Sequence, residues 1–252
     1  MSTSTQPPKP KRRWYQFSLL TLLIVMTLFT VVVGWVGSRM NRARVNRDRV
    51  ATSEKKIKKA VAAIENTGGE VTSSYKELRA QTWLEQQFGD PGGPDDPVGV
   101  LQVTKVDLRL RSVTDADLEH LKGLTTLQHL DLSWNKITDD GLEHLKGLTN
   151  LESLILNDVT IADAGLAHLK WLKSLQRLVL WDTNITDAGL EHLKGLKRLE
   201  SLNLYDTDIT DAGLVHLTAL TDLRILTLQG TKVTDAGVKK LQQALPNCKI
   251  DF

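Results

Sequence analysis

Apolar and polar positions repeat with a period of 24 residues from about residue 103 to the end of the chain. Each copy contains a leucine triplet of the form LxxLxL, and the five regular triplets are Leu127/Leu130/Leu132, Leu151/Leu154/Leu156, Leu175/Leu178/Leu180, Leu199/Leu202/Leu204 and Leu223/Leu226/Leu228. A diverged copy, Val103/Val106/Leu108, precedes them, and a partial copy, Asn247/Ile250/Phe252, follows. Because the last two leucines are two residues apart, each triplet predicts a short strand with one buried face.

The second half of each copy predicts a short helix, as where Leu142, Leu145 and Leu148 share helical spacing. A Thr-Asp pair precedes this half at Thr114-Asp115, Thr138-Asp139, Thr186-Asp187, Thr210-Asp211 and Thr234-Asp235, with Ala162-Asp163 in the remaining copy. Threonine is favoured as a helix N-cap and aspartate in the first turn, so we interpret the pairs as helix starts. Neither half can bury its apolar face alone, so the copies must stack. The sequence predicts a right-handed α/β solenoid with a concave parallel sheet and convex short helices.

An apolar segment near the N-terminus predicts a membrane anchor. Residues 17–37 contain no charged side chain in 21 positions. As a helix the segment would be about 31 Å long, which matches the hydrocarbon core of a bilayer. The alternative is a cleaved secretory signal, whose apolar core usually has about 7–15 residues and ends in a small-x-small site. Since this run is longer and no A-x-A pattern follows it, we expect an uncleaved single-pass transmembrane helix.

Charge is distributed unevenly along the chain. Residues 1–60 carry a formal charge of +11 and residues 61–252 one of −9, which gives the net charge of +2. The basic residues flank the apolar run, so a membrane surface accounts for them better than a nucleic acid does. Four Lys or Arg residues lie in positions 2–16 and five in positions 38–52, so the positive-inside rule leaves the side of the C-terminal domain open.

The region between the anchor and the repeats predicts a cap. Residues 41–66 suit a helix with Ile57, Val61 and Ile64 on one face, and Gly68-Gly69 would end it. A short strand at 70–75, a short helix at 82–88 and a loop at 89–97 are expected to follow. The predicted organisation is a basic tail at 1–16, a transmembrane helix at 17–37, a basic juxtamembrane linker at 38–56, an N-terminal cap at 57–99 and the repeat domain at 100–252.

The repeats resemble those of the leucine-rich repeat proteins. One copy reads TLQHLDLSWNKITDDGLEHLKGL at 126–148, which is similar to the family's ITDAGL-type repeat, and the resemblance covers about residues 100–252. The anchor and the segment AAIENTGGEV resemble the lead-in of bacterial membrane-anchored members. The resemblance implies a curved scaffold for protein recognition without chemistry of its own. The family's Asn or Cys ladder after the strand is present only as Asn135, with Val159, Thr183, Thr207 and Thr231 at the equivalent positions.

Several recurring polar residues are candidates for a catalytic or metal site. A histidine recurs in each copy, at His120, His144, His168, His192 and His216. No column of carboxylates or thiolates completes a metal site around these histidines, so we interpret them as helix-flank positions. Cys248 is the single cysteine, which excludes an intrachain disulfide, and we place it in the terminal capping segment. No catalytic triad or phosphate-binding loop is found, so we predict no enzymatic activity, catalytic residue, metal, cofactor or small-molecule substrate.

Strand residues that point away from the core are the candidates for binding. By alternation these are Lys105, Asp107, Arg109, His129, Asp131, Ser133, Ser153, Ile155, Asn157, Arg177, Val179, Trp181, Ser201, Asn203, Tyr205, Ile225, Thr227 and Gln229. Trp181 and Tyr205 share one column of adjacent copies, and the next column contains Trp134, Asp158, Asp182 and Asp206. Exposed aromatic residues ringed by polar groups are typical of binding hot spots, so these six residues form the candidate protein-binding site. The alternative is that the rings cover the turns after the strands.

The sequence therefore predicts a single-pass membrane protein whose repeat domain is a non-catalytic scaffold for protein–protein interaction. The protein partner is not identified by the sequence, and no nucleic acid is expected. The competing hypothesis is a structural envelope protein that has no specific ligand.

Overall fold

The computed structural model describes residues 41, 44–45, 48–49, 51–77 and 99–252. The chain divides into two compact units, Met1–Arg49 and Val50–Phe252. The predicted membrane segment at 17–37, the predicted helix at 82–88 and the predicted loop at 89–97 lie outside the described residues. Within the described ranges, no helix combines the length and apolar character needed to span a bilayer.

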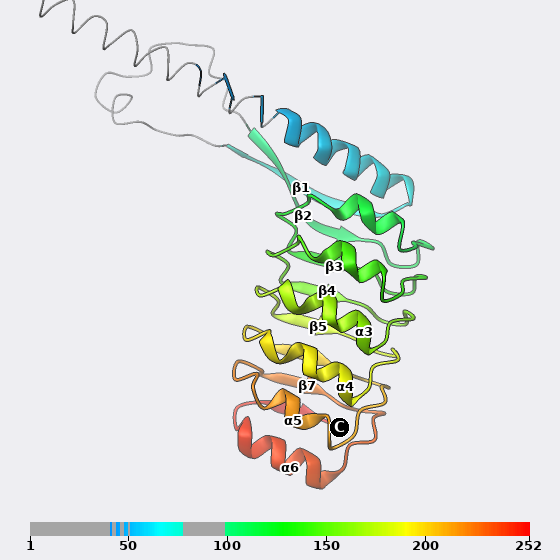
Figure 1. Cartoon of the computed structure of the whole chain (residues 1–252), viewed down its shortest axis with the longest axis vertical. Helices are drawn as coiled ribbons and strands as arrows, with labels where there is room; N and C mark the ends of the chain where they lie inside the picture. The colour runs from blue at the N-terminus through cyan, green and yellow to red at the C-terminus, as the bar shows by residue number, and fades with distance from the viewer. Residues whose placement is uncertain (1–40, 42–43, 46–47, 50, 78–98) are drawn as a thin grey trace, which may run out of the picture. The chain divides into compact units, whose positions relative to one another are not determined.

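Within the described residues, eight strands form one sheet in sequence order (Figure 1). They are β1 Glu70–Glu77, β2 Gly99–Asp107, β3 His129–Asp131, β4 Ser153–Ile155, β5 Arg177–Val179, β6 Ser201–Asn203, β7 Ile225–Thr227 and β8 Lys249–Asp251. Strands β2 to β8 are parallel, and each residue pairs with the one 24 positions further on, as Lys105 does with His129. The predicted parallel sheet is thereby confirmed. The predicted strand near residue 70 is also present as β1, which pairs with β2 in the antiparallel direction.

Short helical segments form the second layer and stack in a column beside the sheet (Figure 1). They are the 3₁₀ helices η1 Asp117–Leu121, η2 Gly141–Leu145, η3 Ala167–Trp171 and η4 Glu191–Gly195, and the α-helices α3 Asp163–Leu166, α4 Asp187–Leu190, α5 Leu214–Leu217 and α6 Asp235–Ala244. A 24-residue copy must also contain a strand and two turns, so little more than two helical turns fit between them. The expected short helices are confirmed.

The core is a continuous column of leucines closed at both ends. The triplet leucines of the five regular copies are all buried. At the N-terminal end, residues 51–66 form a helix whose Ile57, Val61 and Ile64 pack against this core, and Gly68 follows with a φ of +81°. At the C-terminal end α6 and the buried Cys248 belong to the same cluster. Residues 51–77 and 99–252 therefore share one core cluster, to which no described residue of the N-terminal unit contributes. Phe252 departs from the triplet pattern, since half of its surface (51%) is exposed.

A carboxylate in each copy is hydrogen-bonded to the next copy on the helical side of the solenoid. Asp163 accepts from the backbone N–H of Thr186 at 2.8 Å and from its hydroxyl at 2.6 Å. Asp115, Asp187 and Asp211 bind Thr138, Thr210 and Thr234 in the same way, and Asp139 accepts from the N–H of Ala162. The N-cap interpretation of the Thr-Asp pairs is therefore only partly right. Thr186 and Thr234 do cap α4 and α6, but the aspartates join successive copies.

The glycine of each Asp-Ala-Gly segment leaves room for this carboxylate. A Cβ added at Gly189 would fall against Oδ1 of Asp163, and the same holds for Gly141, Gly165, Gly213 and Gly237 with the aspartates 26 residues earlier. The hydroxyl and the amide of Thr234 also lower the pKa of Asp211 from its usual value. The recurring Thr-Asp-Ala-Gly thus encodes a contact between neighbouring copies.

On the other side of each copy, the turn after the strand is held by a buried polar side chain. Asn135 donates to the carbonyls of Leu108 and Leu132 at 2.8 and 2.9 Å and accepts from Val113 N–H at 2.9 Å, so it joins two copies. Thr183, Thr207 and Thr231 instead donate to carbonyls three residues earlier, within their own copy. Val159 offers no such bond, yet Asp158 keeps the left-handed φ of its equivalents.

We expect Leu180→Ala to lower the free energy of unfolding by about 2–5 kcal/mol, because Leu180 is fully buried. Denaturant unfolding of residues 51–252, followed by circular dichroism, measures this change. Val215→Ala is the control, since the Val215 side chain is exposed and its truncation should change the free energy by less than about 0.5 kcal/mol.

We expect Gly189→Ala to destabilise the fragment by about 1–3 kcal/mol, because the new methyl group would collide with Asp163. Elsewhere in a helix this substitution stabilises by about 1 kcal/mol. In an Asp163→Ala background the collision is removed, so Gly189→Ala should become neutral or stabilising. Equal effects in both backgrounds would contradict the packing role of the glycine.

Candidate protein-binding surface

Three aromatic side chains form a cluster where strands β3, β5 and β6 end. The ring of Trp181 lies between those of Trp134 and Tyr205, with centroid distances of 6.3 and 5.8 Å and interplanar angles of 88° and 83°. These edge-to-face contacts are a favourable aromatic geometry. Each side chain keeps 37–38% of its surface exposed. The predicted neighbours Trp181 and Tyr205 are in contact, and Trp134, predicted in the next column, joins them in what we call the aromatic cluster.

The predicted acidic residues line the turn beside this cluster. Asp158, Asp182 and Asp206 are exposed, and their φ angles of 49°, 53° and 54° lie in the left-handed region. Asp, Asn and Gly adopt this region at the lowest cost, and Gly230 occupies the equivalent position with a φ of +75°. Leu110 and Trp134 adopt the same φ at the equivalent positions of the first two copies, so backbone conformation favours aspartate in this row without requiring it. Their carboxylates still remain open to solvent.

Most of the eighteen strand residues predicted to face outward are exposed or half-buried, with two corrections. Ser133 is buried, and its hydroxyl donates to Oδ1 of Asp131 at 2.6 Å. Val179 is also buried, and it lies between Ile155 and Asn203 of the neighbouring strands. Alternation predicts the face to which a side chain points but not how far its neighbours cover it, so the sequence pattern did not predict this burial.

The first two copies present a charged part of the sheet face. Arg109 donates to both carboxylate oxygens of Asp107, with the shortest distance 2.8 Å, and its Nε lies 3.4 Å from Asp131. Burial would raise the pKa of Asp107, but the hydrogen bonds from Arg109 outweigh it and lower that pKa. Lys105 and His129 line the same depression. The sheet face is thus charged near β2 and β3 and aromatic near β5 and β6.

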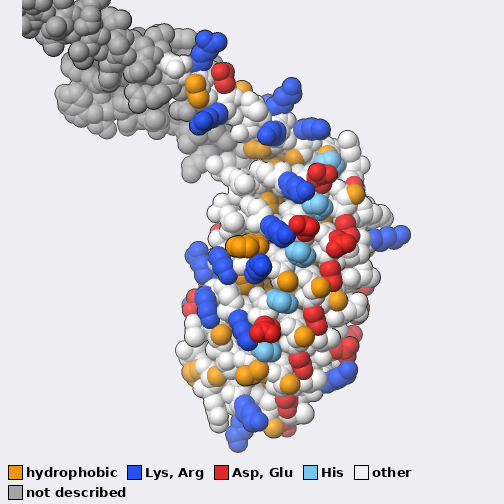
Figure 2. Space-filling view, in the orientation of Figure 1, with side chains coloured by type: hydrophobic (Ala, Val, Ile, Leu, Met, Phe, Trp, Pro, Cys, Tyr) orange, Lys and Arg blue, Asp and Glu red, His pale blue; other side chains and the backbone are white. Residues whose placement is uncertain are grey.

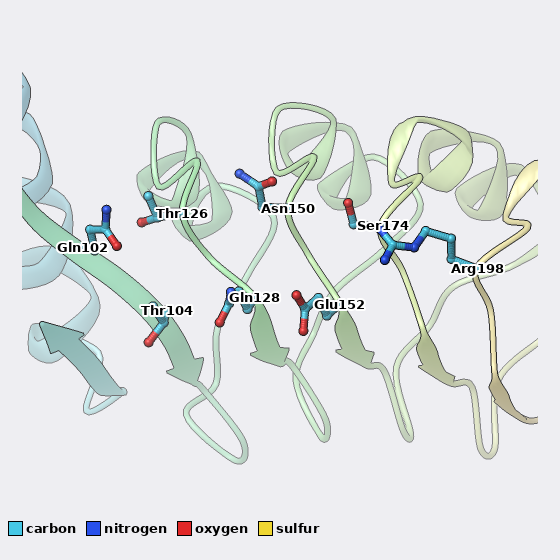
Figure 3. Close-up of a pocket in the computed structure, with 8 residues that line it drawn as sticks. All are labelled: Gln102, Thr104, Thr126, Gln128, Asn150, Glu152, Ser174 and Arg198. Carbon is cyan, nitrogen blue, oxygen red and sulfur yellow. The ribbon is translucent and has the colours of Figure 1, made fainter. Parts of the chain in front are cut away.

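A second, polar groove follows the edge where the strands begin (Figure 3). It encloses about 270 Å³ and is lined by Gln102, Thr104, Thr126, Gln128, Asn150, Glu152, Ser174 and Arg198. These side chains come from successive copies and offer mainly amide and hydroxyl groups. The sequence pattern did not reveal this groove, because its lining positions recur every 24 residues but hold a different residue type in each copy.

The recurring histidines form a row along the helical side (Figure 2). Their side chains are exposed or half-buried, and Nδ1 of His144 and of His216 is buried without a hydrogen-bond partner. Among the described residues, no three His, Cys, Asp or Glu side chains are arranged to hold a metal ion. Burial raises the pKa of Cys248 to about 11, so its thiol is protonated at neutral pH.

Comparisons with known structures returned several repeat proteins. Internalin C2 from Listeria monocytogenes is 27% identical, with a TM-score of 0.43 over 52% of this chain and 54% of that chain. A leucine-rich repeat protein from Leptospira interrogans is 23% identical, with a TM-score of 0.44 over 53% of this chain and 33% of that chain. The leucine-rich repeat ectodomain of the receptor kinase SOBIR1 from Arabidopsis thaliana is 18% identical, with a TM-score of 0.45 over 72% and 96%. This chain thus spans about half the length of the internalin.

Family models match this sequence within its repeats. No curated protein matches this chain. Two family models described as leucine-rich repeat match, one over residues 173–233 and the other over residues 123–146. Both matches fall within the 24-residue copies that form strands β3 to β7 and their helical segments. With that register and the parallel sheet, the two matches show that this chain contains leucine-rich repeats.

Proposed function

We propose that this protein is a membrane-anchored, non-catalytic scaffold that binds a protein partner through its sheet face. The leucine-rich repeat fold suggests a protein-interaction scaffold. The observation that carries the proposal is the aromatic cluster of Trp134, Trp181 and Tyr205, which is more than a third exposed on a rigid frame. Tryptophan and tyrosine are enriched among the few residues that supply most of the binding energy in interfaces.

The charges around the cluster favour a partner with a basic patch. Asp158, Asp182 and Asp206 lie exposed in the adjoining turns, and residues 61–252 carry a formal charge of −9. Complementary charge speeds association, and salt weakens this effect. A partner with an apolar side chain against Trp181 and basic side chains over the three carboxylates would match the surface.

The anchoring part of the proposal rests on the sequence. The uncharged run at 17–37, with basic residues on both sides, supports one transmembrane helix. The side of the membrane that holds the repeat domain determines which partners it meets.

A second candidate is a structural envelope protein without a specific ligand. It is favoured by the contacts of the three rings with one another and by the left-handed backbone of the acidic row. Both features would then serve the turns alone. The binding test below separates the two functions.

We expect Trp181→Ala to weaken partner binding by about 2–4 kcal/mol, because a buried aromatic anchor is lost from the interface. A partner is first captured by crosslinking with residues 51–252, and its affinity for each variant is then measured by calorimetry. Trp171→Ala is the matched control, because Trp171 lies at the end of η3, away from the cluster. Unfolding of Trp181→Ala without a separable loss of affinity would make the ring structural, and self-association alone would favour the envelope protein.

We expect the full chain to stay in the membrane fraction at alkaline pH, and deletion of residues 17–37 to release it. An integral helix resists such extraction, whereas a peripheral protein does not. Protease protection of a C-terminal reporter then gives the side of the repeat domain. Release of the intact chain would contradict the anchor while leaving the sheet-face proposal standing.

A further inference from the structure

One copy of the repeat departs from its neighbours at the end of its helical segment. Trp171 ends η3 at a position where the neighbouring copies have Gly147 and Gly195. The flanking copies present no side chain at this position, and 52% of the Trp171 surface is exposed. The fold does not require a ring at this position, since glycine serves it in the adjacent copies.

The same copy has gained positive charge and lost a carboxylate. In other copies Lys122, Lys146 and Lys194 pair with a glutamate three residues earlier, at 3.9, 2.8 and 3.3 Å. Lys170 occupies the equivalent position, but Ala167 replaces the glutamate. Its Nζ instead lies 5.2 Å from the centroid of the Trp171 ring, within the range of a cation–π contact.

Lys173 follows Trp171 by two residues, and Lys197 and Arg198 follow the equivalent position of the next copy, Gly195. Lys173 donates to the carbonyl of Gly195 at 3.2 Å, and Lys197 donates to that of Ala219 at 2.8 Å. Arg198 lines the groove at the start of the strands. Within the part of the chain that the structure describes, none of these residues nor Lys170 is paired with a carboxylate. We call Lys170, Trp171, Lys173, Lys197 and Arg198 the Trp171 patch.

This basic patch lies on a domain that is acidic overall. Figure 2 shows Lys and Arg side chains gathered on one side of the histidine row, and mostly Asp and Glu on the other. The concentration of cations without a carboxylate partner around one exposed indole favours an anionic partner. Tryptophan favours the interface of a bilayer, and lysine and arginine are attracted to its anionic headgroups.

We propose that the Trp171 patch docks the repeat domain on an anionic phospholipid surface. More than half of the Trp171 surface is exposed, and insertion between headgroups requires an exposed ring. The predicted anchor would also hold the repeat domain close to a bilayer, so a weak affinity of the patch for the lipid surface would be sufficient. This tethering rests on the proposed anchoring, whereas the charges and the indole of the patch do not depend on it.

The geometry leaves the aromatic cluster free in the docked state. Trp171 and Arg198 lie near the edge where the strands begin, because each helical segment ends there before the next strand. Trp134, Trp181 and Tyr205 lie where strands end. The two surfaces occupy opposite edges of the solenoid, so membrane and partner can be bound together.

The test measures cosedimentation of residues 51–252 with vesicles of phosphatidylcholine, with and without phosphatidylserine. We expect binding only to the vesicles with phosphatidylserine, and loss of that binding at high salt. Trp171→Gly, which installs the residue of the neighbouring copies, should abolish most binding. Lys173→Thr with Lys197→Thr should weaken it about 25-fold, since each basic residue near an anionic surface contributes about fivefold.

The controls separate this patch from other surfaces. Trp181→Ala should bind the vesicles as the unchanged fragment does, so a failed sheet-face proposal would not affect this result. The fragment retains Lys55 and Lys56, and binding that survives Trp171→Gly and the double lysine variant would overturn the proposal in favour of that basic segment. Absence of vesicle binding, or salt-sensitive self-association lost in the same variants, would also overturn it.

Discussion

Successive copies of this solenoid have to stack at one constant offset, because their leucines form a core only when each lies over its equivalent 24 residues earlier. The strands alone hold this offset weakly, since most of them are three residues long. The aspartate–threonine bonds supply a second line of contact on the helical side, and each glycine leaves space for the carboxylate of the preceding copy. The sheet and the helical side therefore keep the same 24-residue register. The exposed side chains on both sides follow this register as well.

Much of this fold could be predicted because a repeat presents its pattern several times. The leucine triplets define strands and register, and the core-facing residues of the helical segments follow from their spacing. The antiparallel pairing of β1 could not be predicted, since it joins two segments that occur once and are separated by residues without a periodic pattern. The bond of each aspartate to the next copy was also not predicted. A helix cap and a bond between copies both call for Thr and Asp at the same spacing, so the sequence does not distinguish them.

The position of the candidate site could be predicted from the sequence, but the side-chain contacts and backbone angles that shape it could not. Alternation placed Trp181 beside Tyr205, and the structure brings them into contact. It did not predict that the Trp134 ring would reach Trp181 across an intervening copy, because that depends on side-chain length and rotamer. Nor does a sequence show that Asp158, Asp182 and Asp206 adopt positive φ. In the sequence, the Trp171 patch is only a set of departures from the repeat, such as Trp171 in place of glycine and Ala167 in place of glutamate. The structure shows what these departures change, because the equivalent residues of neighbouring copies lie side by side.

The antiparallel strand β1 has a consequence for self-assembly. A parallel sheet built from identical copies offers, at its first strand, an edge onto which the last copy of another molecule could stack in register. Here β1 occupies the hydrogen-bonding edge of β2, runs in the opposite direction and contains a register shift between Thr72 and Ser73. Such an irregularity bends and twists a strand, so it offers no continuous template for a parallel neighbour. End-to-end polymerisation through this edge would first require β1 to be displaced.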